Sequence, residues 1–371
     1  MSKKHKFKRL ESVVLYFKIH LIIVLILSPN LLSSSLGNFI EADNPKIQYT
    51  GRIDFSNPKE PILYWPGTYI IAKFEGTSLK IRLNDIEGEN YYNIIIDDND
   101  KEPFVLDCEQ DKEIYSITSE LKDTIHKVLV FRRTETLTGP TIFKGFILDE
   151  GKGLFEPPPK PKFKIEFYGN SITSGMGNEC IGDEDEGNES KKNNYLTYSA
   201  ITARNLNAEY VCISKSGIGI LISWFPQTMP EFYYRLNPFD PEIMWDFSKW
   251  IPDIVVINLF QNDSWLIEKL KPLPDSKKII RAYIDFIQKV REKYPEAHIF
   301  CTLGSMDAIK EGQPWPGYIK EAVKTLKEDF DDKRAYSYIF AYDGTGKHPR
   351  VSQHFKMAEE LTIFIKSTLN L

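Results

Sequence analysis

A proline-rich segment at residues 156–162, Glu-Pro-Pro-Pro-Lys-Pro-Lys, divides the chain into two parts with different hydrophobic patterns. Segments of this composition stay extended and act as semi-rigid spacers. A chain of 371 residues also exceeds what one hydrophobic core usually serves. We therefore expect two domains, at residues 38–155 and 163–371, joined by this linker.

The first part reads as β-structure throughout. Its apolar residues mostly alternate with polar ones, and turn signals such as Glu75-Gly76-Thr77 separate the runs. Short strands at this spacing, with no helical period between them, predict a β-sandwich of the jelly-roll type. Trp65 fits either a core position or a sugar-stacking platform. The expected strands are Tyr69–Phe74, Ser78–Leu83, Tyr91–Asp97, Glu113–Ile117, Lys127–Arg132 and Thr141–Leu148.

After the linker, strand patterns alternate with helical ones. Residues 253–260 form a nearly continuous apolar run, as expected for a parallel strand that is buried on both faces. Such alternation predicts a parallel sheet with helices on both faces. The first expected strand runs from Phe163 to Tyr168. The other expected strands are Tyr210–Ser214, Asp253–Phe260 and His298–Leu303, and the expected helices are Ser276–Tyr294, Pro316–Phe330 and Ser352–Leu369.

The N-terminus differs in composition from the rest. Five Lys and Arg residues within residues 3–9 precede an unbroken apolar run at residues 21–27, and a small polar stretch follows. A basic head, a short apolar middle and a small-residue exit describe a secretory signal. We expect residues 1–36 to be a signal peptide of a secreted or periplasmic protein, with an uncleaved membrane anchor as the alternative.

Charge and cysteine content exclude several classes of protein. The net charge of -5 and the lack of aromatic-basic interleaving argue against nucleic-acid binding. The four cysteines, Cys108, Cys180, Cys212 and Cys301, are too sparse for a disulfide scaffold and lack metal-ligand spacing. No metal and no cofactor is expected. A disulfide is compatible with an exported protein, but the spacing selects no pair.

A serine stands where the first strand of the second part ends. The strand at residues 163–168 runs into Gly169, Asn170 and Ser171. The crevice beyond the carboxyl ends of parallel strands is where such sheets bind ligands. Ser171 is therefore a candidate nucleophile, although serine is also a favoured N-cap for a following helix. The spacing is not G-x-S-x-G, which disfavours the nucleophile elbow of α/β-hydrolases.

A serine nucleophile needs a base, and His348 is the candidate that elimination leaves. It lies in a glycine-rich loop before the last helix, and Pro349 holds its backbone extended. The remaining histidines fall in the targeting segment, the first domain, a strand edge or a helix, namely His5, His20, His126, His298 and His354.

Acyl transfer also needs donors for the developing oxyanion, and two loops offer them. Gly217 follows the second strand of this part, where glycine permits close approach of backbone N–H groups. Asn262 follows the third strand and carries a side-chain amide. The order of serine, glycine, asparagine and histidine after successive strands is more specific than any one of them.

This order resembles the SGNH (GDSL-like) hydrolases, and the wider sequence is similar to carbohydrate esterase family two. The stretches that carry the resemblance include Gly51-Arg52-Ile53-Asp54, Trp65-Pro66-Gly67-Thr68, Arg132-Arg133-Thr134-Glu135, Ser216-Gly217-Ile218-Gly219 and Trp245-Asp246-Phe247. The resemblance implies a jelly roll followed by a flavodoxin-like α/β/α domain. It also implies an exported acetylesterase whose partner is an acetylated carbohydrate.

By that resemblance, Ser171 is the nucleophile and His348 is its general base, later the acid. The oxyanion hole would consist of the Ser171 and Gly217 N–H groups and the Asn262 side chain. The family has Asp before the nucleophile, where this chain has Asn170, and we expect little effect.

Two other departures concern the surroundings of the site. Phe260 stands two positions before Asn262, where the family usually has a glycine. A phenylalanine there would narrow the site, and it would be strained if the position needs a positive φ. The positions that often supply the triad carboxylate hold Thr345 and Gly346. Either Asp343 reaches His348 or a backbone carbonyl orients the ring in a dyad. Phe260 and Lys347 are candidates for substrate contacts.

Two alternative functions remain open at this stage. A degenerate site would leave a carbohydrate-binding protein, which the missing aspartate and Phe260 would favour. An esterase for lipids or other acyl esters would keep the chemistry, but the chain shows no long apolar lid.

Overall fold

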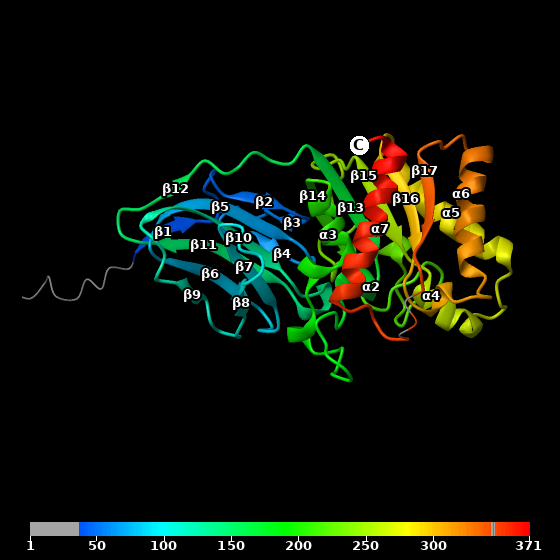
Figure 1. Ribbon diagram of the computed structural model, residues 1–371, viewed down its shortest axis with the longest axis horizontal. Helices are drawn as coiled ribbons and strands as arrows, with labels where there is room; N and C mark the ends of the chain where they lie inside the picture. Colours follow the sequence, from blue (N-terminus) through cyan, green and yellow to red (C-terminus); the bar gives the residue numbers. More distant parts are fainter. Residues whose placement is uncertain (1–36, 343, 345) are drawn as a thin grey trace, which may run out of the picture.

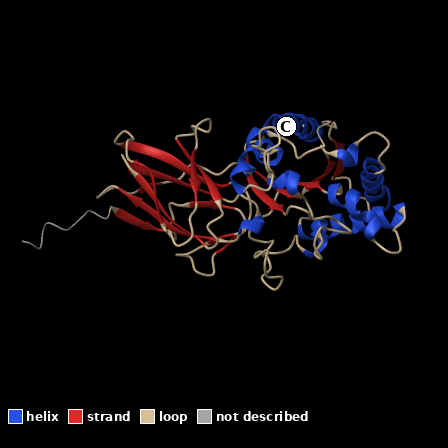
Figure 2. Cartoon of the chain, turned by 90° about the horizontal axis from the view of Figure 1, so that it is seen from below, coloured by secondary structure: helices blue, strands red, loops and turns tan. Residues whose placement is uncertain are grey.

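The computed structural model describes residues 37–342, 344 and 346–371. Two bodies lie side by side along the long axis of the molecule, one built of strands and one of alternating strands and helices (Figures 1 and 2). The predicted signal peptide or anchor at residues 1–36 lies outside the described residues, as does Asp343. Within the described part, no helix is both long enough and apolar enough to span a membrane.

Two antiparallel sheets form the N-terminal body. One has the strand order β3-β4-β11-β6-β9 with β1 on β11, and the other β12-β5-β10-β7-β8 with β2 on β5. The inward side chains of both sheets, such as Ile81 and Val128, form one core. Period-two alternation puts these apolar residues on a single face of each sheet. The strands are β1 (Asn38–Glu41), β2 (Gln48–Thr50), β3 (Ile53–Asp54), β4 (Ile62–Leu63), β5 (Tyr69–Gly76), β6 (Leu79–Asp85), β7 (Tyr91–Ile96), β8 (Phe104–Asp107), β9 (Ile114–Thr118), β10 (Thr124–Arg132), β11 (Thr141–Leu148) and β12 (Leu154–Phe155).

The six strands expected in this part are all present within one to three residues at their ends. The sequence pattern missed the short strands because two to four residues are too few to show alternation. Trp65 occupies a core position, since it is 1% exposed and its indole N–H donates to the Leu236 carbonyl at 2.8 Å. The sugar-platform alternative for Trp65 is therefore wrong.

The proline-rich segment runs back along the sandwich from β12 to the second body (Figure 1). It has no regular secondary structure, and the Gln48 side chain donates to the Pro158 carbonyl at 2.9 Å. Proline has no N–H to donate to a neighbouring strand, so the segment stays outside both sheets.

A five-stranded parallel sheet, in the order β14-β13-β15-β16-β17, is the centre of the second body. This confirms the expected parallel sheet, and the order is that of doubly wound flavodoxin-like folds. Helices α5 and α6 cover one face of the sheet, and α3 and α7 cover the other. The elements are β13 (Phe163–Gly169), α2 (Ser171–Ser174), α3 (Tyr198–Asn205), β14 (Ala208–Ser214), β15 (Ile254–Asn258), α4 (Gln261–Leu266), α5 (Ser276–Lys293), β16 (His298–Leu303), α6 (Trp315–Asp329), β17 (Ala335–Ile339) and α7 (Val351–Leu369).

Within the described residues, His126, His354 and the four cysteines occupy structural positions outside the crevice. The His126 ring bonds to Asp97 at 2.6 Å and to the Lys122 carbonyl at 2.8 Å. His354 is buried in α7, and burial lowers its pKa to about 3, so it is neutral at ordinary pH. All four cysteines are buried as free thiols.

A buried ion pair joins the two bodies. The Arg52 guanidinium comes from the sandwich and meets Glu166 of β13 at 2.9 Å, with both side chains 0% exposed. The same guanidinium contacts the Tyr168 hydroxyl at 3.0 Å, and that hydroxyl donates to Glu166 at 2.6 Å. Buried charges are tolerated only when they are paired and hydrogen-bonded, so this cluster fixes how the two bodies dock.

We predict that Glu166→Gln lowers the free energy of unfolding by about 3–5 kcal/mol, because it leaves the Arg52 charge buried without a counter-charge. Urea unfolding followed by circular dichroism measures the change. The control is Asp285→Asn, which breaks the exposed Arg281–Asp285 pair and should cost no more than about 1 kcal/mol. Equal losses in the two variants would contradict the role of the buried pair.

Candidate active site

The topology of the sheet brings three strand ends together. β13 lies between β14 and β15, and Gly169 at its end is paired in register with Ser214 and with Asn258. The loops that follow these strands therefore leave the sheet at one place. Gly217 lies in the loop after β14, whereas Ser171 and Asn262 lie at the starts of the short helices α2 and α4 that follow the other two strands.

Ser171 is the first residue of α2 rather than its cap. The N-cap is Asn170, whose side-chain oxygen accepts the Ile172 N–H at 3.0 Å. The cap interpretation of Ser171 is therefore wrong, and its hydroxyl is not used on its own helix. The serine is 7% exposed, so its hydroxyl is held within the site while a small part of the residue still reaches solvent.

His348 lies beside this serine. Its Nε2 is 2.8 Å from the Ser171 Oγ, which is hydrogen-bond distance for a proton transfer. The ring comes from the loop before α7, and Pro349 after it restricts the backbone to extended conformations. The structure thus brings together a hydroxyl and an imidazole that are 177 residues apart in sequence.

The other ring nitrogen of His348 contacts Glu186, which sequence reasoning did not single out. Nδ1 is 2.7 Å from the Glu186 Oε2, and Oε1 of the same carboxylate accepts from Arg350 at 2.6 Å. The hydrogen bond from His348, with further help from Arg350, lowers the pKa of Glu186 to about 2 against a smaller opposing effect of burial. A carboxylate, rather than a backbone carbonyl, therefore orients the ring. Asp343, the carboxylate considered for this position, lies outside the described residues.

Glycine allows the Glu186 loop to approach the serine helix. Gly177 has φ +56°, and a Cβ there would lie 2.6 Å from the Glu186 Cβ. The Gly177 carbonyl also accepts from Arg350 at 2.8 Å. Arg350 thus connects the Glu186 carboxylate to the backbone just after α2.

The two oxyanion-donor candidates lie beside each other, because the Asn262 side chain bonds to the residue that follows Gly217. Gly217 has φ +84°, and a Cβ there would be within 3.3 Å of Trp224 and Phe225, so glycine is required. The Asn262 amide donates to the Ile218 carbonyl at 2.8 Å and accepts from the Trp224 indole at 3.2 Å. These two bonds fix the amide orientation and leave its second N–H free of both partners.

Asp263 orders the loop that follows Gly217. Its buried carboxylate accepts the N–H groups of Ile220, Leu221 and Ile222 at 2.7–3.2 Å. Burial raises the pKa of Asp263 to about 6, and the backbone donors oppose that rise. The carboxylate is still ionised at neutral pH, so it can hold three consecutive N–H groups.

The sandwich contributes residues that hold both loops of the site. Glu135 accepts the Ser216 N–H at 3.1 Å, immediately before Gly217, and its other oxygen pairs with Lys192 at 2.8 Å. Glu135 is 2% exposed and Lys192 is 3% exposed. Arg133 pairs with Glu179, in the segment that leads to Glu186. The sandwich is therefore part of the framework of this site.

Phe260 does not face the crevice. It has φ +86° and is 0% exposed, and its ring packs on Tyr283 and Trp315 at centroid distances of 4.7 and 5.2 Å. The expected strain at positive φ is present, but the expected substrate contact is wrong, since the aromatic side chain fills the core. Lys347 forms an exposed ion pair with Asp183, and its substrate contact stays a prediction.

Sequence reasoning missed Glu186 because it lies in the acidic run at residues 183–189, which has the composition of a solvated loop. Arg350, two residues after His348, was the available signal, since arginine is well suited to pair with a carboxylate. Within the described residues, no group of three potential metal ligands occurs.

Comparisons with known proteins match nearly the whole described chain. The family described as carbohydrate esterase 2 N-terminal matches residues 49–158. The cellulase/esterase CelE of Acetivibrio thermocellus is 36% identical over 89% of this chain, which spans 40% of the length of CelE. An acetylxylan esterase / glucomannan deacetylase of Cellvibrio japonicus is 26% identical over 87% of this chain and 89% of its own length.

Solved structures agree with these matches. A family two carbohydrate esterase from Clostridium thermocellum, solved with cellohexaose, is 34% identical with a TM-score of 0.78, over 87% of this chain and 99% of that one. A family two carbohydrate esterase from Cellvibrio japonicus has a TM-score of 0.79 at 22% identity, which shows the fold alone.

We predict that Glu186→Gln slows phosphonylation of Ser171 by a fluorophosphonate reagent about 10²–10⁴-fold, because the neutral amide no longer stabilises the imidazolium. The matched control is Glu184→Gln in the same loop, whose carboxylate bonds to Ile181 and Lys191 instead. Unchanged labelling in Glu186→Gln would contradict the assignment.

The same variant tests the low pKa of Glu186. Its folded-state pKa of about 2 is below the ordinary 4.5, so the carboxylate stabilises the fold fully above 4.5. That contribution is lost as the pH falls through 2. The stability difference between the native protein and Glu186→Gln should therefore shrink from pH 7 to pH 3 in denaturant titrations.

Proposed function

The chain belongs to carbohydrate esterase family 2, and on this premise we propose that it removes O-acetyl groups from polysaccharides or sugars by way of an acyl-enzyme. The observation that carries the proposal is the connected set Ser171, His348 and Glu186, with contacts of 2.8 and 2.7 Å. A carboxylic ester hydrolase of the serine type needs a nucleophile, a base and a group that orients the base, and these three side chains supply them.

The first half of the reaction acylates the serine. The Ser171 Oγ attacks the acetyl carbonyl carbon while its proton moves to the Nε2 of His348. Glu186 accepts from Nδ1, so it holds the tautomer that leaves Nε2 as the acceptor and stabilises the imidazolium that forms. When the tetrahedral intermediate collapses, the C–O bond to the sugar breaks and Nε2 returns the proton to the sugar oxygen. Water then repeats the sequence and releases acetate.

Donors for the oxyanion come from the segments that follow three neighbouring strands. The Ser171 and Gly217 N–H groups donate to no acceptor within the described residues, and the Asn262 amide has an uncommitted N–H. Each such donor is worth about 2.7–4 kcal/mol in the transition state. Ser171 stands at the N-terminus of α2, where free backbone N–H groups favour negative charge.

The surroundings fit a sugar as the alcohol part of the ester. Trp224 is 59% exposed, and its indole N–H bonds to Asn262. An exposed indole fixed beside the reacting atoms provides an apolar face for a sugar ring. A relative named acetylxylan esterase / glucomannan deacetylase and a homologue bound to cellohexaose support a β-linked polysaccharide as the substrate class.

Two finer features belong to the same proposal. The paired antiparallel sheets and the family match at residues 49–158 support a jelly-roll topology for the N-terminal domain. The basic and apolar pattern of residues 1–36 supports export of the protein to where plant polysaccharides are found, by a signal peptide or with a retained anchor.

We predict that Ser171→Ala reduces hydrolysis of p-nitrophenyl acetate and release of acetate from acetylxylan by at least about 10³-fold, because no covalent intermediate can form. The matched control is Ser174→Ala, one turn later on α2, where the hydroxyl bonds to Ser214. A residual rate above a tenth of the native rate would overturn the proposed function. A sharp preference for acetyl over longer acyl chains would exclude the lipid alternative.

We predict that Glu135→Gln lowers kcat for acetyl-ester hydrolysis about 10-fold or more while KM changes less than about 3-fold, since it loosens the Ser216–Gly217 donor loop that matters in the transition state. Glu135→Asp should recover less than the native rate, because its shorter chain cannot reach both Ser216 and Lys192. A higher KM with an unchanged kcat would show that Glu135 acts on substrate binding instead.

A further inference from the structure

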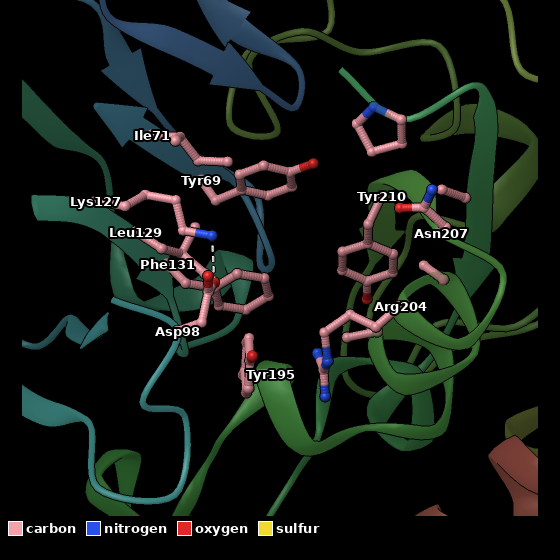
Figure 3. A pocket seen from close by; sticks show the side chains of 14 residues that line it. Tyr69, Ile71, Asp98, Lys127, Leu129, Phe131, Tyr195, Arg204, Asn207 and Tyr210 are labelled. Carbon is pink, nitrogen blue, oxygen red and sulfur yellow. Dashed lines mark ion pairs between the residues drawn. The ribbon is translucent and has the colours of Figure 1, made fainter. Parts of the chain in front are cut away.

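A second pocket lies between the two domains, at the end of the sheet opposite to Ser171. It has a volume of about 250 Å³ and includes Ala208 at the start of β14. Ser214, beside the active site, ends the same strand, so roughly 20 Å of strand separates the two places at about 3.3 Å per residue. Figure 3 shows side chains from β5 and β10 of the sandwich on one side and from α3 and β14 on the other.

The sandwich side of this pocket is unusually apolar for an outer sheet face. Phe131 stands opposite Tyr69 and Leu129 stands opposite Ile71 on neighbouring strands, all on the side away from the sandwich core. An antiparallel sheet with one solvated face ordinarily carries polar residues there. The second domain covers Phe131, which is 3% exposed, but Tyr69, Ile71 and Leu129 remain partly open.

Aromatic rings line both sides of the pocket in nearly parallel planes. Tyr69 and Phe131 stack at a centroid distance of 6.1 Å, and Phe131 and Tyr210 stack at 6.4 Å, each with an interplanar angle of 10°. Flat apolar faces of this kind suit the ring of a sugar, whose C–H groups pack on aromatic surfaces. The volume is below the roughly 300–1,000 Å³ of drug-sized sites, so it suits a single sugar unit.

One positive charge at the pocket has no hydrogen-bonded carboxylate partner within the described residues. The Arg204 guanidinium stacks 3.7 Å above the Tyr195 ring and is exposed. Within the described residues it forms no hydrogen bond and no ion pair, although the Asp100 carboxylate opposes the lowering of its pKa by burial. Lys127, by contrast, is paired with Asp98, and the Asp100 carboxylate accepts from the Tyr195 hydroxyl at 3.3 Å. Stacking uses the face of a guanidinium and leaves its N–H edge for a carboxylate.

We propose that this pocket binds a sugar unit that carries a carboxylate, such as a uronic acid of a polysaccharide. The sugar ring lies against Tyr69 and Tyr210, and the carboxylate accepts two N–H groups from Arg204. The choice of a polysaccharide as the ligand rests on the proposed function, but the pocket, its rings and the Arg204 guanidinium do not. The site would hold an acidic branch of the substrate while Ser171 acts elsewhere on the chain.

The test is calorimetric binding of a glucuronic-acid-bearing xylo-oligosaccharide without acetyl groups to the full chain. Arg204→Gln should weaken this binding by at least about 10-fold, because the amide cannot form the charged bidentate contact. The control is Arg281→Gln, whose side chain is exposed on α5 and paired with Asp285, and its affinity should stay native. Both variants should hydrolyse p-nitrophenyl acetate at the native rate.

A second variant keeps the proposal falsifiable. Leu129→Trp fills the pocket from the sandwich side and should abolish the Arg204-dependent binding without changing acetate-ester hydrolysis. Native affinity in Arg204→Gln, or equal affinity for the neutral xylo-oligosaccharide of the same length, would overturn the proposal. Displacement of the oligosaccharide by acetate at equal concentration would show an anion site only, and would overturn it as well. All of these variants should keep the native esterase activity. A failure of the pocket proposal can therefore be distinguished from a failure of the proposed function.

Discussion

The buried Arg52–Glu166 pair is the contact on which the rest of the arrangement depends. Glu166 and Tyr168 lie on β13, the strand that ends at Gly169 and leads into the serine helix. A guanidinium with 0% exposure can be accommodated only in the one docking geometry that supplies its partners. The pair therefore fixes the sandwich against the strand that presents Ser171.

This fixed docking explains why a non-catalytic domain contributes to the site. Once β13 is held, the end of β10 and the residues after it meet the loops that leave β13 and β14. Glu135 takes the Ser216 N–H, and Thr136 donates to the Ser214 carbonyl at 3.0 Å. Loops with few apolar contacts are the low-stability part of a fold. Here the sandwich domain supplies the polar contacts that order them, so the donor geometry depends on both domains.

The sequence predicted what depends on strand ends and missed what depends on loop conformation. Ser171, Gly217 and Asn262 could be found because parallel strands put their carboxyl ends at one edge of the sheet. Glu186 could not, because nothing local distinguishes it among the acidic residues 183–189, and its role depends on a tertiary contact with Arg350. β17 was missed because it is an edge strand whose residues are mostly half-buried, so it lacks the continuous apolar run of the central strands. Phe260 was assigned to the crevice because backbone φ alone does not say where a side chain points.

Two carboxylates near the site have opposite relations to pH, and the difference follows from their surroundings. The hydrogen bond from His348, with further help from Arg350, lowers the pKa of Glu186 to about 2, so its stabilising contribution is present at neutral pH. Burial raises the pKa of Asp263 to about 6, so the folded state favours its neutral form. That contribution to stability is present below the ordinary pKa of 3.8 and is lost as the pH rises through 6.

Yet the ionised form of Asp263 is the stronger acceptor for the N–H groups of residues 220–222. The donor loop is therefore best ordered in the pH range where Asp263 stabilises the fold least, which is a cost to stability imposed by the geometry of the site.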